Sequence, residues 1–177
     1  EKPRDETVNP TINKNVDKAI NSQHSLYQFG KPATTSYPAA VQTINEWFQT
    51  HLSTPPPHLT NGSGLCRDCT ISAANLSELL TYAYAHPSFD SYVNSLGIAG
   101  VSGTILTHSE RLPKSNAIGR AWIKTGTLNN VTSMAGYVKG LSGQDYVVVG
   151  LINNEQALNT YTARTVLDAM LDWTALH

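Results

Sequence analysis

The stretch AWIKTGTL, residues 121–128, decides the fold. Two further apolar runs follow it after short polar connections, at residues 131–138 and 146–152. Runs of this length, separated by turn-forming residues, predict neighbouring strands of an antiparallel sheet. Because strand side chains alternate between the two faces of a sheet, two sets of neighbours are expected. The first set is Trp122, Lys124 and Gly126, and the second is Ile123, Thr125 and Thr127.

Lys124 lies in an otherwise apolar stretch, and two interpretations fit its position. In the first, Gly126 leaves bare backbone beside the lysine, where a ligand chain hydrogen-bonds to the main chain while Lys124 offers a charge. In the second, Lys124 extends its ammonium group to water and Gly126 marks a bulge.

Helical periodicity appears on both sides of the predicted sheet. The last run, residues 147–152, is apolar on both of its faces, which predicts helices on both sides of the sheet. The fold class is therefore α/β, with an antiparallel sheet flanked by helices. Helices are expected over residues 11–29, 36–52, 72–86, 88–96 and 159–174, with a loop over residues 97–119. The expected buried stripe of the last helix is Val166, Met170 and Trp173, widened by Ala163 and Leu167.

Length and composition limit the class of protein. The chain has 177 residues, 40% of them apolar and 14% charged, which suits one globular domain over residues 1–177. The formal net charge is −1 and the basic residues are scattered, so nucleic-acid binding is not expected. No run is long enough for a transmembrane helix, and residues 1–15 hold no signal-peptide core. The first residue is therefore expected to be a mature end or a fragment end.

Cys66 and Cys69 are the only cysteines. Their spacing permits a disulfide within the loop, two free thiols, half of a metal site or a redox pair. Zinc needs four ligands and only His51 and His58 lie nearby, so no metal or other cofactor is expected. The six histidines share no spacing, and we expect each to be solvated or to have a hydrogen-bonding partner in the core.

Four short motifs carry a resemblance to a known family. Lys124-Thr125-Gly126-Thr127 resembles the Lys-Thr-Gly box of penicillin-binding proteins and serine β-lactamases. The other three motifs resemble segments of the low-molecular-mass class C penicillin-binding proteins, in the same order along the chain. They are residues 61–65 (NGSGL, with Ser63), residues 99–104 (AGVSGT) and residues 134–137 (MAGY). The chain thus resembles the penicillin-binding protein 4-like D-alanyl-D-alanine carboxypeptidases and endopeptidases over nearly its whole length.

The resemblance implies a transpeptidase-like fold and roles for particular residues. In the family, a Ser-x-x-Lys pair supplies the acylated nucleophile and its base, and a Ser-x-Asn box relays protons. By this resemblance, Lys124 acts through its positive charge and the Thr127 amide donates to the oxyanion. Thr125 and Thr127 are implied to bind the substrate carboxylate. Gly126 and Ser63 are implied as substrate-binding positions.

Two departures from the family pattern are visible. No lysine from Lys14 onward has a serine three positions before it, so the nucleophile motif is absent. The chain therefore resembles the C-terminal part of the catalytic domain, with the nucleophile in a segment outside it. In addition, residues 12–18 (INKNVDK) place Val16 and Lys18 where the family has serine and asparagine, and only Asp17 of this second motif is kept. Val16 also fits the core side of the first predicted helix.

The leading functional prediction is a peptidoglycan D-Ala-D-Ala carboxypeptidase or endopeptidase of the periplasm or cell envelope. Its expected partners are the peptidoglycan stem peptide, β-lactams in the full-length parent, and a missing N-terminal part of the same protein. This chain alone is expected to be inactive. The alternative is a non-catalytic protein of the same fold that binds cell-wall peptide or a partner, and the altered residues Val16 and Lys18 favour it.

Overall fold

The computed structural model describes residues 36–154 and 160–177. The chain separates into two compact units, Glu1–Ser72 and Ala73–His177. The predicted helix over residues 11–29 lies outside the described residues. That residues 1–177 form one globular unit stays a prediction.

The described part of the first unit contains one helix, α3, at Tyr37–His51. The Ser36 side chain caps it by accepting the Ala39 N–H at 3.4 Å, and Pro38 lies in its first turn, where a missing N–H costs nothing. Phe48 and Leu52 are buried on the apolar side of this helix. The chain then runs through a loop in which His58 and Thr70 form an isolated antiparallel bridge.

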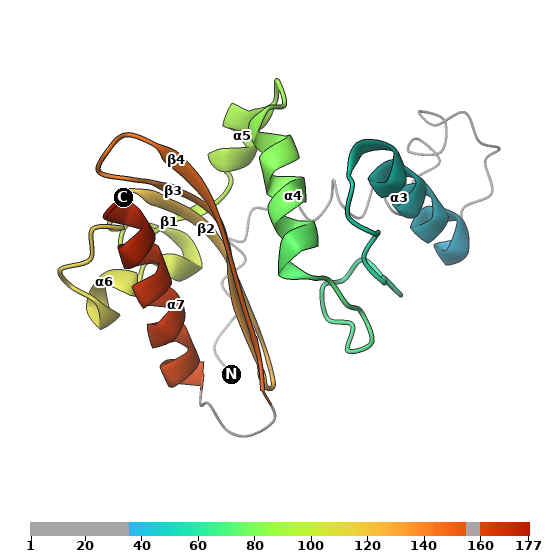
Figure 1. Cartoon of the computed structure of the whole chain (residues 1–177). Coiled ribbons are helices and arrows are strands. Elements are labelled where there is room, and N and C mark those ends of the chain that lie inside the picture. Colours follow the sequence, from blue (N-terminus) through green and yellow to red (C-terminus); the bar gives the residue numbers. More distant parts are fainter. Residues whose placement is uncertain (1–35, 155–159) are drawn as a thin grey trace. The chain divides into compact units, whose positions relative to one another are not determined.

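The second unit is built around a four-stranded antiparallel sheet, and it contains the predicted strands (Figure 1). The strands follow one another in the order β1-β2-β3-β4. They are β1 (Gly97–Ile98), β2 (Ala121–Leu128), β3 (Val131–Lys139) and β4 (Asp145–Asn153). The helices are α4 (Ala73–Tyr84), α5 (Phe89–Val93), the 3-10 turn η1 (Gly103–Ile105), α6 (His108–Arg111) and α7 (Thr160–Ala175).

A tight turn fixes the register of β2 against β3. Leu128 pairs with Val131, and between them Asn130 has a φ of 65°, a left-handed conformation that asparagine tolerates. The same register places Ile123 opposite Gly136 and Thr125 opposite Met134. Directly opposed residues of an antiparallel pair share a face, so the register decides which side chains meet each flanking helix.

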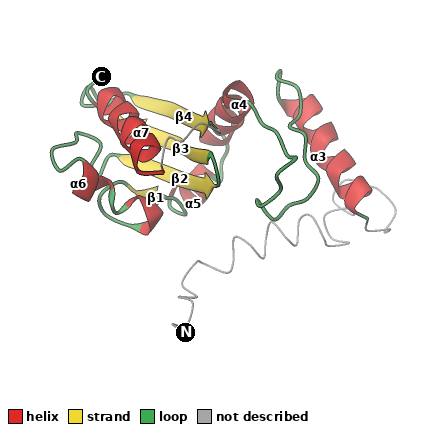
Figure 2. Ribbon diagram, turned by 90° about the horizontal axis from the view of Figure 1, so that it is seen from below, coloured by secondary structure: helices red, strands yellow, loops and turns green. Residues whose placement is uncertain are grey.

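Helices cover both faces of the sheet, as predicted. One face packs against α7, and Figure 2 shows this helix lying along the strands. On the other face, the Tyr137 hydroxyl donates to the Leu80 carbonyl of α4 at 2.7 Å, and the Tyr137 ring packs edge-on against Phe89. Burial raises the pKa of Tyr137, so its hydroxyl stays a donor. The core on the α7 side includes Ile105, Ala121, Ile123, Met134, Val138, Val148, Leu167 and Leu171.

The predicted loop over residues 97–119 is wrong in part, because the segment folds into β1, η1 and α6. Gly100 and Gly103 have φ values of 70° and 64°, which permit sharp reversals. A side chain at Gly103 would place Cβ 3.0 Å from the Gly97 Cα, so only glycine lets η1 lie this close to β1. Such reversals leave no hydrophobic period in the sequence.

The predicted buried stripe of α7 is also wrong in part. Val166 and Trp173 are 54% and 64% exposed, while Ala163 and Leu167 are buried as expected. The helix is rotated toward Leu171 and Asp168, which are 0% and 1% exposed. A charged residue normally indicates an exposed position, so Asp168 made the buried side of α7 look exposed in the sequence. A carboxylate is buried only where partners compensate its charge. No described helix has the length and apolar character needed to cross a membrane.

Candidate functional site

The C-terminal half of β2 forms an open edge of the sheet. β1 pairs with β2 only at Trp122 and Ile123, and in the described chain no strand continues beyond that point on this side. The Ala121 carbonyl accepts the Ala99 N–H at 2.9 Å, which shows that this residue's main chain points toward β1. Main-chain direction alternates along an antiparallel strand, so the N–H and C=O groups of Thr125 and Thr127 also point to the open edge.

The side chains of the KTGT motif divide between the two faces, in agreement with the predicted alternation. Thr125 and Thr127 share the α7 face with Met134 and Thr132, their partners on β3. Lys124 and Gly126 share the opposite face, where a Cβ on Gly126 would lie 2.5 Å from the Ser133 hydroxyl oxygen. The missing side chain of Gly126 therefore accommodates Ser133.

Lys124 is exposed and its ammonium group turns toward the edge. Its Nζ donates to the Thr125 carbonyl at 2.7 Å. The motif thus combines a charge and two hydroxyl groups with main-chain donors and acceptors on a single strand edge. Such an edge can take up an extended chain as an additional strand.

A pocket of about 270 Å³ lies at this part of β2. Its lining includes Lys124, Thr125 and Thr127 from β2. Arg111 of α6 and Arg164 of α7 supply two guanidinium groups, and no described residue that lines the pocket is acidic. A positive pocket that also carries hydroxyl groups is suited to an anion.

Thr104 places a third hydroxyl at the pocket. Its Oγ1 lies 2.6 Å from the Thr125 Oγ1, so one hydroxyl donates to the other. Thr104 belongs to η1, which the Gly97–Gly103 approach holds beside the sheet. The position lay within the AGVSGT motif of the sequence, although no role was expected for it.

Arg111 is held in place by a buried carboxylate. Its Nε and Nη2 donate to the two carboxylate oxygens of Asp168, at 2.5 and 3.1 Å, and its Nη1 donates to the Thr107 hydroxyl at 2.5 Å. Burial raises the pKa of Asp168, but hydrogen bonds from His108 and Arg111 outweigh it and lower that pKa overall. Asp168 is therefore ionised at neutral pH and fixes the guanidinium at the pocket wall.

Ser115, His108 and Asp168 are arranged like a serine-protease triad. The Ser115 Oγ lies 2.7 Å from His108 Nε2, and His108 Nδ1 lies 2.6 Å from Asp168 Oδ1. All three side chains are buried, however, and the Ser115 oxygen accepts the Ala117 N–H. No substrate reaches them, so this cluster is structural. His108 thus confirms the expectation of a core histidine with hydrogen-bonding partners.

The other predicted site residues are not among the described residues of the second unit. Val16, Asp17 and Lys18 are outside the described residues. Ser63 belongs to the first unit, where its hydroxyl donates to Asn61 Oδ1 at 2.7 Å and accepts the Leu65 N–H at 3.1 Å. These two hydrogen bonds stabilise the turn over residues 61–65. Ser63 as a substrate-binding residue stays a prediction.

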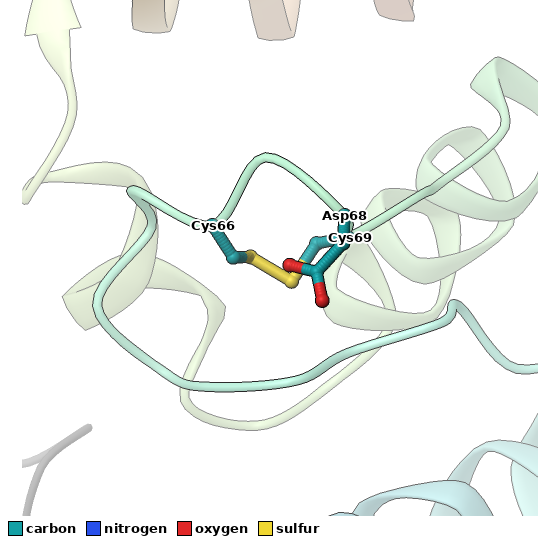
Figure 3. A group of neighbouring side chains, drawn as sticks. All are labelled: Cys66, Asp68 and Cys69. Atoms are coloured by element: carbon teal, nitrogen blue, oxygen red, sulfur yellow. A yellow bond between two sulfur atoms is a disulfide. The ribbon is translucent and has the colours of Figure 1, made fainter.

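Cys66 and Cys69 form a disulfide within one loop of the first unit (Figure 3). This outcome selects one of the alternatives left open by their spacing. Asp68 lies beside the bridge and accepts the Thr60 hydroxyl at 2.9 Å. Its carboxylate and the two sulfur atoms lie within 4.8 Å of one another. The sulfurs are bonded to each other and are not available as thiolate ligands.

Sequence comparison identifies relatives of this chain. Residues 24–176 match the model of the D-Ala-D-Ala carboxypeptidase 3 (S13) family. Penicillin-sensitive carboxypeptidase A of Dictyostelium discoideum is 29% identical over 174 residues, which cover 88% of this chain and 32% of that protein. Carboxypeptidase DacB of Mycolicibacterium smegmatis is 35% identical over 126 residues, which cover 67% of this chain and 26% of that protein. The chain therefore spans about a third or less of the length of these relatives.

Structural comparison gives the same result for the fold. Two structures of penicillin binding protein 4 of Haemophilus influenzae, one of them complexed with a β-lactam, match with a TM-score of 0.66 and 18% identity. The match covers 89% of this chain and 39 to 40% of those chains. This likeness confirms the predicted fold class, an antiparallel sheet flanked by helices of the penicillin-binding type.

Proposed function

Because the chain belongs to the D-Ala-D-Ala carboxypeptidase 3 (S13) family, we propose that it is the peptide-binding part of a peptidoglycan D-Ala-D-Ala carboxypeptidase or endopeptidase. This match confirms the family predicted from the sequence motifs. The observation that carries the proposal is the open edge of β2, where Lys124, Thr125 and Thr127 border a pocket without acidic side chains.

In the proposed complex, the end of the substrate peptide lies along this edge as an added strand. Main-chain groups of Thr125 and Thr127 hydrogen-bond to it, and the threonine hydroxyls donate to its terminal carboxylate. The Thr125 carbonyl accepts from Lys124 Nζ and has a second lone pair with which it can accept a substrate N–H. The ammonium group of Lys124 then lies beside the bound peptide.

The proposed reaction is acyl transfer to a serine that lies outside these 177 residues. As the serine oxygen attacks the carbonyl carbon between the two D-alanines, its proton passes to the lysine base of the Ser-x-x-Lys motif, which also lies outside these residues, and the resulting oxyanion accepts a hydrogen bond from the Thr127 N–H. The tetrahedral intermediate collapses, the C–N bond breaks, and the leaving amine takes up that proton. Water then cleaves the serine ester and releases the shortened peptide. In endopeptidase action the leaving amine belongs to a cross-linking peptide.

Electrostatic stabilisation is the contribution we assign to Lys124, and Asp17 is the one residue of the second motif that we retain as catalytic. Gly126 and Ser63 complete the proposed substrate-binding set. We place the parent protein in the periplasm or cell envelope, where its substrate occurs, and expect it to bind β-lactams, as the Haemophilus influenzae protein does in its complex.

A second candidate is a non-catalytic protein of the same fold that binds cell-wall peptide or a partner. The specific observation in its favour is the pair Val16 and Lys18 in the second motif. Valine cannot relay a proton, so Val16 in the place of the family's serine removes that step of the reaction.

Labelling the full-length parent with a fluorescent penicillin separates the two candidates. We expect stable labelling at a serine that precedes residue 1, and none when that serine is replaced by alanine. A folded parent that never labels would contradict the enzymatic proposal and favour the binding protein. For the 177-residue chain alone, mass spectrometry is expected to detect no covalent β-lactam adduct.

A further inference from the structure

We propose that Arg164 of α7 recognises the free terminal carboxylate of the substrate peptide and thereby selects peptides with an unmodified C-terminus. Arg111 lines the same pocket but is engaged by Asp168, which leaves Arg164 as the guanidinium available to a ligand. This inference rests on the proposed function, because it names what the β2 edge distinguishes in its ligand. Arg164 lies outside the KTGT motif and would determine specificity for the carboxylate at the end of the peptide.

Arg164 is attached to the KTGT motif through a hydroxyl group. Its Nη2 lies 3.3 Å from the Thr127 Oγ1 and donates to it. The Thr127 oxygen then accepts from the guanidinium, which leaves its own proton to donate outward into the pocket. An arginine and a threonine arranged in this way present neighbouring donors to one anion.

The charge of Arg164 has no acidic partner among residues 36–154 and 160–177. Arg111 differs, because three of its N–H groups are engaged by Asp168 and Thr107 and its charge is neutralised by that carboxylate. The pocket therefore contains one arginine fixed by an internal ion pair and one whose planar fork is available to a ligand. That fork matches the two oxygens of a carboxylate.

The size of the pocket favours the end of a chain as its occupant. Its volume of about 270 Å³ is below the roughly 300 to 1,000 Å³ of cavities that hold a whole drug-sized ligand. A terminal alanine with its carboxylate is small enough to enter while the rest of the peptide follows the β2 edge. Two of the lining residues, Thr132 and Met134, are 6% and 1% exposed, so this side of the pocket excludes water and strengthens the attraction of an anion to Arg164.

The competing explanation is that Arg164 only tethers α7 to the end of β2. A tether predicts lower stability when the arginine is lost, with no dependence on the chemistry of the peptide terminus. Ligand binding by Arg164 predicts that its loss weakens a peptide acid and spares the matching amide.

The test is an NMR titration of the isotopically labelled 177-residue chain with acetyl-D-alanyl-D-alanine and with its C-terminal amide. We compare the unaltered chain with Arg164→Gln and with Lys114→Gln, which removes the same charge at an exposed residue outside the pocket. Arg164→Gln is expected to weaken binding of the acid at least tenfold and to leave the amide unchanged. Lys114→Gln is expected to alter neither.

Equal binding of the acid by the unaltered chain and by Arg164→Gln would overturn the inference while leaving the proposed function intact. Equal binding of acid and amide by the unaltered chain would do the same. If neither peptide binds the unaltered chain, the proposed peptide-binding role of this chain fails, and titration with inorganic sulfate decides the inference separately. Sulfate-induced shifts at residues 125–127 that vanish in Arg164→Gln support an anion site, and their absence overturns it.

A protein whose fold is lost through the substitution is recognised in the same spectra, because the amide signals of β3 and β4 collapse. Arg164→Lys then provides the second variant. It keeps the charge but loses the planar fork, so intermediate binding of the acid is expected. If Arg164→Lys binds the acid as weakly as Arg164→Gln does, the positive charge at this position does not contribute to binding.

Discussion

The Thr104 and Thr125 hydroxyl oxygens lie 2.6 Å apart and join η1 to the open edge of β2. One of the two protons is used within this pair, so a single hydroxyl proton remains for a ligand. This hydrogen bond also holds the half-buried Thr125 side chain in one orientation at the pocket. Thr104 is therefore a positioning residue for the motif.

Replacing Thr125 with valine is expected to weaken binding of acetyl-D-alanyl-D-alanine by about tenfold. The change keeps the shape of the side chain but removes a donor to the carboxylate, and a hydrogen bond to a charged group contributes roughly 1.5 to 3 kcal/mol. Thr104→Val is expected to have a smaller effect, since it removes only the orienting partner. NMR titration measures both. Thr81→Val, on the exposed side of α4, is the control, and a Thr104→Val effect larger than that of Thr125→Val would contradict this order.

The main-chain amide of Thr127 can be tested apart from its hydroxyl. Proline is tolerated on an edge strand where the lost N–H points away from the sheet, which is the orientation inferred for this residue. Thr127→Val removes the hydroxyl and keeps the amide, whereas Thr127→Pro removes both. We expect Thr127→Pro to bind the peptide several-fold more weakly than Thr127→Val. The same two variants are made in the full-length parent protein, where the rate of acylation by a fluorescent β-lactam is measured. We expect Thr127→Pro to be acylated roughly 10² to 10³ times more slowly than Thr127→Val.

If the two variants have equal peptide affinities and acylation rates, the amide does not contact the substrate. The fold of each variant is checked from the cross-strand amide signals of β3, since a proline that disrupted the sheet would remove them.

Gly136 is required by the packing of β3 against β2. It has a φ of 155°, and a Cβ there would lie 2.0 Å from the Trp122 carbonyl oxygen, a contact with rigid backbone. Gly136→Ala is expected to destabilise the protein by more than about 3 kcal/mol, because the two strands must separate locally. Gly119→Ala is the matched control. It also has positive φ, at 70°, but open space around it, so a cost of about 1 to 2 kcal/mol is expected. Urea unfolding measures both, and equal costs would refute the steric explanation.

The fold of residues 121–152 was predictable because three apolar runs of strand length are separated by short turn-forming segments. Gly136 was visible only as part of a family motif, since its requirement comes from a neighbouring strand's carbonyl group. The helix α7 shows the opposite difficulty. Its period was clear, but its phase depended on Asp168, whose burial makes sense only when Arg111 and His108 are known to meet it.

The same reasoning explains what was missed in the candidate site. Lys124, Thr125 and Thr127 are contiguous, so the motif itself indicates them. Arg164 lies 37 positions from Thr127 in the sequence, and only the packing of α7 on the sheet brings the two together. A single arginine on a helix has no pattern of its own. Residues assembled by long-range packing are therefore the part of this site that the sequence does not reveal.

Asp168 provides a stability prediction with a defined pH dependence. Asp168→Asn leaves Arg111 without its partner beside the pocket and weakens the hydrogen bond from His108, and breaking a buried ion pair in this way costs about 3 to 5 kcal/mol. At neutral pH, urea unfolding is expected to show a loss of this size relative to the unaltered chain. Asp90→Asn, at an exposed position in the first turn of α5, is expected to change stability by less than about 1 kcal/mol.

The advantage of the unaltered chain over Asp168→Asn should disappear in acid. The pKa of Asp168 is lowered in the folded state, so the unfolded state binds more protons as the pH falls. The stabilisation is therefore complete above the unfolded pKa of about 3.9 and is lost progressively as the pH falls through the lower folded value. Unfolding free energies of the two proteins are compared at pH 7, 4 and 3. A difference that stays constant, or grows, between pH 4 and the lowest pH at which both proteins fold would show that the ionised carboxylate of Asp168 is not the source of the stabilisation.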